Sequence, residues 1–211
     1  ECSGYSYRYT LSGALDETAG GLHGLISSAE WTGVPLHFLL DEAGVDASAQ
    51  WVIAEGADAA GMNRSVPLSL ALNDAMIALY QNGEPLRRSQ GFPMRLLVPG
   101  CEGNLSVKWL RSLKLLDQPA QTREETSKYT DLTLDGKAAQ FSLRMQAKSV
   151  ITSPSGKMRL GRQGVYEISG LAWSGNGSIR RVEVSADGGR SWAEAMLQSE
   201  PGPMRAVRFR I

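Results

Sequence analysis

The stretch from Gly91 to Leu110, GFPMRLLVPGCEGNLSVKWL, constrains the fold more than any other part of the chain. Residues 94–98 are apolar and β-rich apart from one arginine, which predicts a short strand. Pro99-Gly100 predicts a tight turn at the end of that strand. A loop with further glycine follows, and a second apolar run begins at Val107. The sequence therefore predicts two strands joined by a loop that presents backbone N–H groups.

The same stretch contains side chains that suit an anionic, phosphorylated ligand. Arg95 and Lys108 provide two cations and Ser106 provides a hydroxyl, and such groups complement phosphate oxygens. We expect Arg95 and Lys108 to be solvated and to converge on one anionic site, because the loop returns Lys108 beside the strand of Arg95. The alternative is an ordinary strand–loop–strand with surface charges, and spacing alone does not separate the two.

Composition narrows the class of protein. The chain has 211 residues, enough for one large or two small domains, and 42% hydrophobic with 21% charged residues is globular usage. Lys plus Arg equals Asp plus Glu at 22 each, which argues against a nucleic-acid partner. No apolar run reaches the ~18 residues that a membrane span needs. The opening Glu1-Cys2 is not a signal peptide, and mature exported proteins also lack one.

The cysteines and histidines leave several chemistries open. Cys2 and Cys101 could form a disulfide, stay as thiols or bind a metal. Zinc is disfavoured because no CxxC or clustered histidine pattern is present. His23 and His37 are isolated, and each is expected to be a surface or hydrogen-bonded side chain.

Apolar spacing predicts the elements of the first part of the chain. Pro35 is expected to open a helix in which Leu36, Leu39, Leu40 and Ala43 share one apolar face. Residues 51–54 predict a strand that leads into a loop containing Asp58, and Asn82-Gly83 predicts a hairpin turn. Residues 122–129 are polar and are expected to form a loop.

The pattern changes after about Lys148. Short strands are predicted at residues 165–168, 171–173 and 179–184, separated by glycine-rich turns at roughly the spacing of a β-sandwich.

Three separated motifs, GFPMR, PGxxGxxxVKWL and TREETSKYTDL, occur in this order along the chain. Together they resemble the sulfite oxidase family of molybdopterin enzymes, and most of all the molybdenum subunits of bacterial sulfane dehydrogenases in sulfur-oxidising systems. The phrases GLAWSGNG and VEVSADGGRSW resemble the immunoglobulin-like dimerisation domain of that family. The resemblance covers the whole chain.

The resemblance implies an α+β fold: a mixed α/β molybdenum-cofactor domain followed by an immunoglobulin-like β-sandwich. We expect the cofactor domain at residues 1–147, without its N-terminal part. We expect the dimerisation domain at residues 148–211, truncated at its C-terminal end because a complete sandwich needs ~100 residues.

The resemblance also implies a set of site residues. Cys2-Ser3-Gly4 matches the motif whose thiolate ligates molybdenum, although Tyr5 stands where Asn is usual. A thiolate is a soft donor suited to such a metal. Asp58 fits an acceptor of hydrogen bonds from the pterin ring, and a solvated loop Asp is the alternative. Gln90 stands where the family often has His, which leaves its role open.

The remaining implied roles lie further along. Arg95 fits a pterin contact, and Ser106, Val107 and Lys108 fit the triplet that contacts the phosphate and pterin of the cofactor. Tyr129 fits the tyrosine whose hydroxyl points at the metal centre and substrate, where a phenol can donate a hydrogen bond and pass a proton. Cys101 is expected to pack in the core.

The implied function is a molybdenum-dependent oxidoreductase that oxidises sulfane sulfur or sulfite by oxygen-atom transfer. The implied substrate is a sulfur oxyanion or carrier-bound sulfane, the electron acceptor a cytochrome c, the assembly a homodimer through the sandwich, and the location the periplasm. Two alternatives stay open: a non-catalytic dimerisation or assembly module, and a sulfoxide-reductase-like molybdoenzyme.

Overall fold

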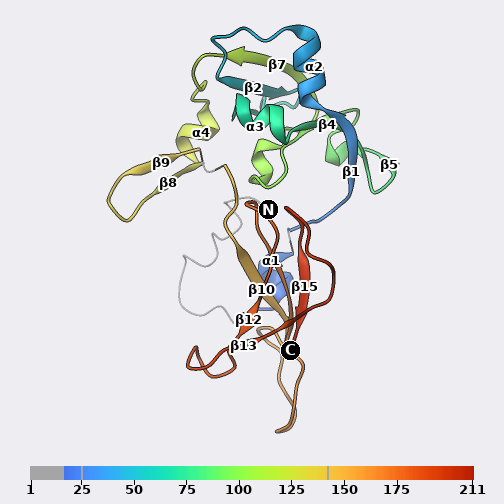
Figure 1. Ribbon diagram of the computed structural model, residues 1–211, viewed down its shortest axis with the longest axis vertical. Coiled ribbons are helices and arrows are strands. Elements are labelled where there is room, and N and C mark those ends of the chain that lie inside the picture. Colours follow the sequence, from blue (N-terminus) through green and yellow to red (C-terminus); the bar gives the residue numbers. More distant parts are fainter. Residues whose placement is uncertain (1–16, 25, 142) are drawn as a thin grey trace. The chain divides into compact units, whose positions relative to one another are not determined.

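The computed structural model describes residues 17–24, 26–141 and 143–211. These residues form two compact units (Figure 1). Residues 29–143 form the larger unit, here called the 29–143 unit. Residues 144–211 and the described residues before Ala29 form the second, here called the 144–211 unit. No helix of the described part of the chain is both long and apolar enough to cross a membrane.

One sheet of the 29–143 unit has β2 (Trp51–Gly56) at its centre. Strand β2 pairs antiparallel with β3 (Asn63–Pro67) on one side and with β7 (Leu110–Leu116) on the other. Alternate residues of β2 point inward, and Val52 and Ala54 are completely buried. This alternation of burial is expected for a strand with one face on a core. The strand predicted at residues 51–54 is therefore confirmed.

The second sheet of this unit is organised around β4 (Met76–Gln81). It pairs antiparallel with β1 (Trp31–Pro35), with β5 (Glu84–Pro85) and with β6 (Arg95–Leu97). The β4–β5 hairpin turns at Asn82-Gly83, where both residues have positive φ. The predicted hairpin is thus present, with the backbone that such a turn requires.

Helix α2 (Leu36–Ala43) follows β1, and only part of its predicted apolar face is buried. Leu36 and Leu40 are buried, but Leu39 is 45% exposed and Ala43 is exposed as well. Successive helical residues are 100° apart, so Leu36 and Leu40 lie close together around the axis while Leu39 lies to one side. The helix therefore contacts the core through Leu36 and Leu40, and not through all four of the predicted apolar residues.

The other elements of the unit are short: α3 (Leu68–Asn73), the 3₁₀ turns η2 (Arg88–Gln90) and η3 (Gly103–Leu105), α4 (Arg123–Ser127), β8 (Thr130–Leu132) and β9 (Ala138–Gln140). Helix α4 shows that the predicted loop at 122–129 is wrong. Thr122 and Glu125 form a capping box, in which each side chain accepts a hydrogen bond from the backbone N–H of the other residue. These two bonds satisfy N–H groups that a five-residue helix otherwise leaves without partners.

The core of the 29–143 unit lies between its sheets and helices. Its most deeply buried members are aliphatic side chains from both sheets, α2 and the loops: Leu36, Val52, Val66, Leu96, Val98, Leu105 and Val107. Cys101 belongs to this cluster and is 5% exposed. Its position agrees with the expected packing role.

The 144–211 unit contains mostly β-structure. Its main sheet has the order β10 (Lys148–Ser153), β11 (Ser169–Trp173), β15 (Val207–Arg210), β14 (Met196–Leu197). Strands β12 (Glu183–Val184) and β13 (Ala193–Glu194) form a separate antiparallel pair. Helix α1 (Ala19–His23) also belongs to the 144–211 unit. The buried cluster joins both sheets: Ala172, Ile179, Val184, Ala195, Val207 and Phe209.

Two predicted strands of this unit need correction. Residues 165–168 are not a strand, because regular pairing with β15 begins only at Ser169. Of the predicted strand at 179–184, only Glu183–Val184 pairs. Sheet structure is nevertheless dominant, and the immunoglobulin-like topology stays a prediction.

Candidate functional site

Arg95 is the central cation of the candidate site, and it is buried rather than solvated. Its side chain leaves strand β6 and is 8% exposed. The guanidinium donates to the backbone oxygens of Gln90 at 3.1 Å and Ser106 at 2.7 Å. It also lies 5.1 Å from the ring centroid of Trp31. Burial lowers the pKa of Arg95 from its ordinary value to about 10, so the group is still charged at neutral pH.

Lys108 reaches the same turn from the other end of the loop. Its ammonium donates to the backbone oxygen of Ser89 at 3.0 Å and lies 4.6 Å from the ring centroid of Trp109. The indole N–H of Trp109 donates to the backbone oxygen of Arg88 at 2.9 Å. Three successive carbonyls of η2 therefore receive donors, one from β6 and two from the residues just before β7. Arg95 and Lys108 converge as expected, whereas their binding of an anion stays a prediction.

Two glycines allow the backbone to approach Lys108 closely. Gly91 has a φ of +107°, and a Cβ atom placed there would lie 3.0 Å from Cβ of Lys108. A Cβ on Gly56 would lie 2.7 Å from the backbone oxygen of Lys108 and 3.1 Å from a carboxylate oxygen of Asp58. Side chains at these positions would push the surrounding segments apart. The glycines thus hold Asp58, η2 and Lys108 in one small region.

Ser106 and Val107 are more internal than the sequence indicates. The hydroxyl of Ser106 accepts a hydrogen bond from the N–H of Val98 at 3.1 Å, and the residue is 8% exposed. Val107 is 2% exposed, and its backbone bonds to Leu105 and Leu96. The structure therefore gives both residues a role in shaping the loop, and their contact with a cofactor stays a prediction.

Asp58 forms a tight loop after β2. One carboxylate oxygen accepts the backbone N–H groups of Ala60 at 2.9 Å and Met62 at 3.1 Å. The second oxygen, Oδ2, has no hydrogen-bond donor among the residues that the structure describes. That oxygen faces the Gly56 backbone beside Lys108. Asp58 is therefore both a structural loop residue and a possible acceptor for a ligand N–H.

Gln90 lies between Arg95 and a polar cavity. Its side-chain oxygen is 3.4 Å from the guanidinium of Arg95. The cavity has a volume of about 440 Å³ and is lined by Gln81, Asn82, Glu84, Pro85, Arg87, Ser89 and Gln90. Its lining offers both donors and acceptors next to η2, as a polar heterocycle requires.

Tyr129 lies just after α4 and packs against a buried cation that the sequence did not reveal. The guanidinium carbon of Arg64 is 4.3 Å from the ring centroid of Tyr129. Arg64 belongs to β3 and is completely buried. Cys2, the predicted molybdenum ligand, lies outside the described residues, and within them no group of three or more His, Cys, Asp or Glu side chains could hold a metal ion.

Glu125 is a second residue that the sequence reasoning missed. It is completely buried, and its carboxylate lies 3.6 Å from Nε of Arg64. The carboxylate accepts the N–H of Ser65 at 2.5 Å and the N–H of Thr122 at 2.9 Å. The T-x-x-E pattern of Thr122 and Glu125 is a capping-box signal that could have located α4, although not its buried partner.

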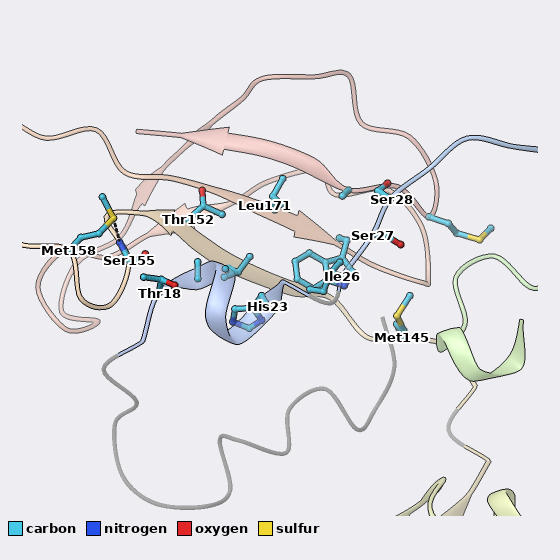
Figure 2. A pocket seen from close by; sticks show the side chains of 16 residues that line it. Thr18, His23, Ile26, Ser27, Ser28, Met145, Thr152, Ser155, Met158 and Leu171 are labelled. Carbon is cyan, nitrogen blue, oxygen red and sulfur yellow. Dashed lines mark hydrogen bonds between the residues drawn. The ribbon is translucent and has the colours of Figure 1, made fainter. Parts of the chain in front are cut away.

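A larger cavity lies within the 144–211 unit and contains none of the predicted site residues. It has a volume of about 600 Å³ and an apolar lining that includes Met145, Met158, Leu171 and Trp173. Figure 2 shows that its side chains come from α1, from strands β10 and β11 and from loops, with His23, Thr152, Leu171 and Met158 among them. Such a lining does not suit a phosphorylated cofactor.

The site at η2 fits a phosphorylated pterin by its chemistry. Nε of Arg95 is buried, and the described residues offer it no hydrogen-bond partner. A buried cation with a spare donor is costly unless an acceptor binds there. Lys108, Asp58 and the polar cavity supply a second cation, an acceptor for ring N–H groups and further polar atoms.

Comparisons with protein families point in the same direction. Residues 1–124 match the family described as "Oxidoreductase molybdopterin binding domain". Residues 139–210 match the "Mo-co oxidoreductase dimerisation domain".

Individual relatives include sulfite oxidases and a nitrate reductase. The chain is 34% identical to mitochondrial sulfite oxidase of Mus musculus over 207 residues, which are 89% of this chain and 38% of the mouse protein. It is 34% identical to NADPH nitrate reductase of Phytophthora infestans over 199 residues, 81% of this chain and 22% of that protein. The chain thus spans about two fifths of the sulfite oxidases that it matches.

A solved structure resembles the whole chain. The crystal structure of the sulfane dehydrogenase SoxCD from Paracoccus pantotrophus superposes with a TM-score of 0.93 at 46% sequence identity. The superposition covers 100% of this chain and 54% of that chain.

Proposed function

This chain belongs to the sulfite oxidase family of molybdopterin-binding oxidoreductases. We propose that it holds a molybdenum–molybdopterin cofactor and catalyses the oxidation of an inorganic sulfur compound. The family matches confirm the resemblance found in the sequence. They also confirm the fold class, a cofactor-binding domain followed by a dimerisation domain with mixed helix and sheet content.

The observation that carries this proposal is the buried guanidinium of Arg95. Burial has a high electrostatic cost, and two backbone carbonyls leave one N–H of the group without a partner among the described residues. A bound anion or pterin acceptor would complete this set of hydrogen bonds. Lys108 adds a second charge on the neighbouring carbonyl of η2.

Other residues are proposed to complete the cofactor site. Asp58 accepts ring N–H groups through Oδ2, and Gln90 provides an amide at the edge of the polar cavity. Ser106 and Val107 shape the loop that ends at Lys108. Cys2 is proposed as the thiolate ligand of molybdenum, on the strength of the sequence motif alone.

The cofactor, when bound, supplies oxygen-atom transfer and accepts two electrons. The chain supplies the surroundings in which that chemistry occurs. Tyr129 donates a hydrogen bond from its phenol to the oxygen of the reacting anion, which stabilises charge that develops there. Oxidation of sulfite with water releases two protons and two electrons, and the same phenol is proposed to pass one of these protons.

Sulfane sulfur is the proposed substrate class, with sulfite as the second candidate. Identity to the sulfane dehydrogenase is 46% over the whole chain, compared with 34% to the sulfite oxidases over less of it. The proposed acceptor is a cytochrome c, which takes the electrons one at a time. Assembly as a homodimer is proposed from the match to a dimerisation domain, and a periplasmic location from the resemblance to sulfur-oxidising systems.

The test combines cofactor content with turnover. The full-length protein is purified, its molybdenum is measured by elemental analysis, and cytochrome c reduction is followed with thiosulfate-derived sulfane or with sulfite as the donor. We expect about one molybdenum atom per chain and faster turnover with the sulfane donor. A protein that lacks molybdenum would support the non-catalytic assembly module instead, and faster turnover with sulfite would exclude the sulfane preference.

A further inference from the structure

The pair of Arg64 and Glu125 is a buried charged cluster among the described residues that the proposed function does not use. Both side chains are 0% exposed, and they join strand β3 to helix α4. Neither side chain reaches solvent, so neither can touch a substrate that enters from outside. Any role in the reaction must be exerted through a neighbouring residue.

A gain in stability is a weak explanation for this pair. Removing two charges from water is costly, and apolar side chains of similar volume often serve a fold equally well. A buried pair does define one geometry, because each charge needs its partner at a fixed place. The pair is therefore best explained by something whose position it fixes.

That neighbour is Tyr129. The guanidinium carbon of Arg64 lies 4.3 Å from the ring centroid of Tyr129, within the range of a cation–π contact. The same guanidinium is held by the carboxylate of Glu125. A cation on the face of the ring fixes the ring plane and draws electron density from the phenol, which makes its O–H a stronger hydrogen-bond donor.

The backbone around Tyr129 is fixed by the same cluster. The carboxylate of Glu125 is anchored by the N–H and the hydroxyl of Ser65. The backbone oxygen of Glu125 accepts the hydroxyl of Thr130 at 3.0 Å, and the backbone oxygen of Tyr129 accepts the N–H of Phe141 at 3.1 Å. Thr130 is thus tied to helix α4, and the backbone of Tyr129 is tied to Phe141, just after β9.

We propose that Arg64 is a positioning residue for Tyr129, and that its buried ion pair with Glu125 holds the phenol in the orientation that the reaction needs. The inference rests on the proposed function, because it assigns a purpose to the phenol of Tyr129. The claim that Arg64 fixes the position of the Tyr129 ring can be tested without cofactor and without measuring turnover.

The main variant removes both charges at once, Arg64→Met with Glu125→Gln. Loss of only one partner would leave a buried charge uncompensated and could unfold the protein. Methionine keeps the apolar stem, and glutamine keeps an oxygen for the N–H of Ser65. The matched control is Arg111→Met with Glu55→Gln, which removes an ion pair of 3.4 Å whose arginine is 64% exposed.

The first measurement concerns the ring itself. The protein is labelled with 3-fluorotyrosine without cofactor, and the ¹⁹F resonance of Tyr129 is assigned by its loss in Tyr129→Phe. We expect this resonance to move toward the frequency of free fluorotyrosine in Arg64→Met/Glu125→Gln and to stay unchanged in the control pair. An unchanged resonance in the main variant would overturn the proposal, whether or not the protein is a molybdoenzyme.

The second measurement is a cycle of four full-length proteins: wild type, Arg64→Met/Glu125→Gln, Tyr129→Phe and their combination. We expect the charge-pair variant to lower kcat for cytochrome c reduction about 10- to 100-fold, the scale of a misplaced group, with KM and molybdenum content unchanged. In the Tyr129→Phe background the same change should lower kcat less than about 2-fold.

If Arg64→Met/Glu125→Gln lowers kcat equally in the wild-type and Tyr129→Phe backgrounds, the ion pair does not act through the phenol. Loss of molybdenum in the charge-pair variant would identify a structural support of the cofactor site and would also overturn the proposal. A wild-type protein without molybdenum or turnover defeats the proposed function alone, because the fluorine measurement still decides whether Arg64 holds the ring.

Discussion

Replacing Arg95 with methionine separates the fold from the cofactor site. The guanidinium is 8% exposed and donates to the carbonyls of Gln90 and Ser106. Methionine fills much of the same volume and donates nothing. The variant therefore removes the buried charge without opening a large cavity.

The expected cost to the fold can be worked from these contacts. Two carbonyls that lose their donor cost about 1–3 kcal/mol each, so about 2–6 kcal/mol together. The lowering of the pKa of Arg95 to about 10 means that keeping its charge buried costs about 3 kcal/mol, and the variant removes this cost. The expected change in the free energy of unfolding therefore runs from a gain of about 1 kcal/mol to a loss of about 3 kcal/mol.

The assay is molybdenum content and thermal unfolding on the same full-length preparations. The largest expected loss, about 3 kcal/mol, corresponds to a fall of the unfolding midpoint by at most about 12 °C, so the fold should survive. Molybdenum content should fall at least about 10-fold, the equivalent of 1.4 kcal/mol of cofactor binding. Arg111→Met, on an exposed arginine of β7, is the control and should keep its molybdenum. Full molybdenum content in Arg95→Met would refute the reasoning, as would complete unfolding.

Three further changes test separate parts of the account. Cys2→Ser should abolish molybdenum-dependent turnover with an unchanged circular dichroism spectrum, because a hydroxyl is a poor substitute for a soft thiolate; unchanged turnover would exclude Cys2 as the ligand. Tyr129→Phe should lower kcat about 10- to 1000-fold with normal molybdenum content, and an unaltered kcat would make Tyr129 an ordinary loop residue. The pKa of Asp187 is lowered from 3.8 to about 2, first by the hydroxyl of Ser191 and then by backbone N–H groups. Its carboxylate therefore stabilises the turn above about pH 4 and loses this effect as pH falls to about 2; an NMR titration midpoint near 3.8 would contradict the hydrogen-bonded turn.

Local signals predicted the surroundings of the site well. Proline and glycine act on their own backbone, so the turn after β6 and the Asn82-Gly83 hairpin could be located from sequence. The convergence of Arg95 and Lys108 also follows from such a turn, because a strand and its returning loop end side by side.

Burial and long-range pairing could not be predicted in the same way. Arg95 was expected to be solvated, since nothing near it in the sequence shows that Trp31 and two carbonyls enclose it. Arg64 and Glu125 lie on elements that are far apart in the sequence, and each resembles a surface charge until β3 and α4 are packed together. Helix α4 was missed although its capping box is visible in the sequence.

The exposed side of α2 shows that apolar spacing alone does not predict which residues are buried. An apolar residue indicates burial only when another element covers it, and Leu39 and Phe38 are exposed in the 29–143 unit. Periodicity predicted the helix correctly and its buried face only in part.

The most direct test of the central claim is the molybdenum content of the full-length protein with both converging cations replaced, Arg95→Met with Lys108→Met. The account predicts about one molybdenum atom per chain in the wild type and in the control Arg111→Met, and almost none in the double variant, with a retained cooperative unfolding transition. A folded double variant that keeps its molybdenum would contradict the assignment of the cofactor to the turn at η2.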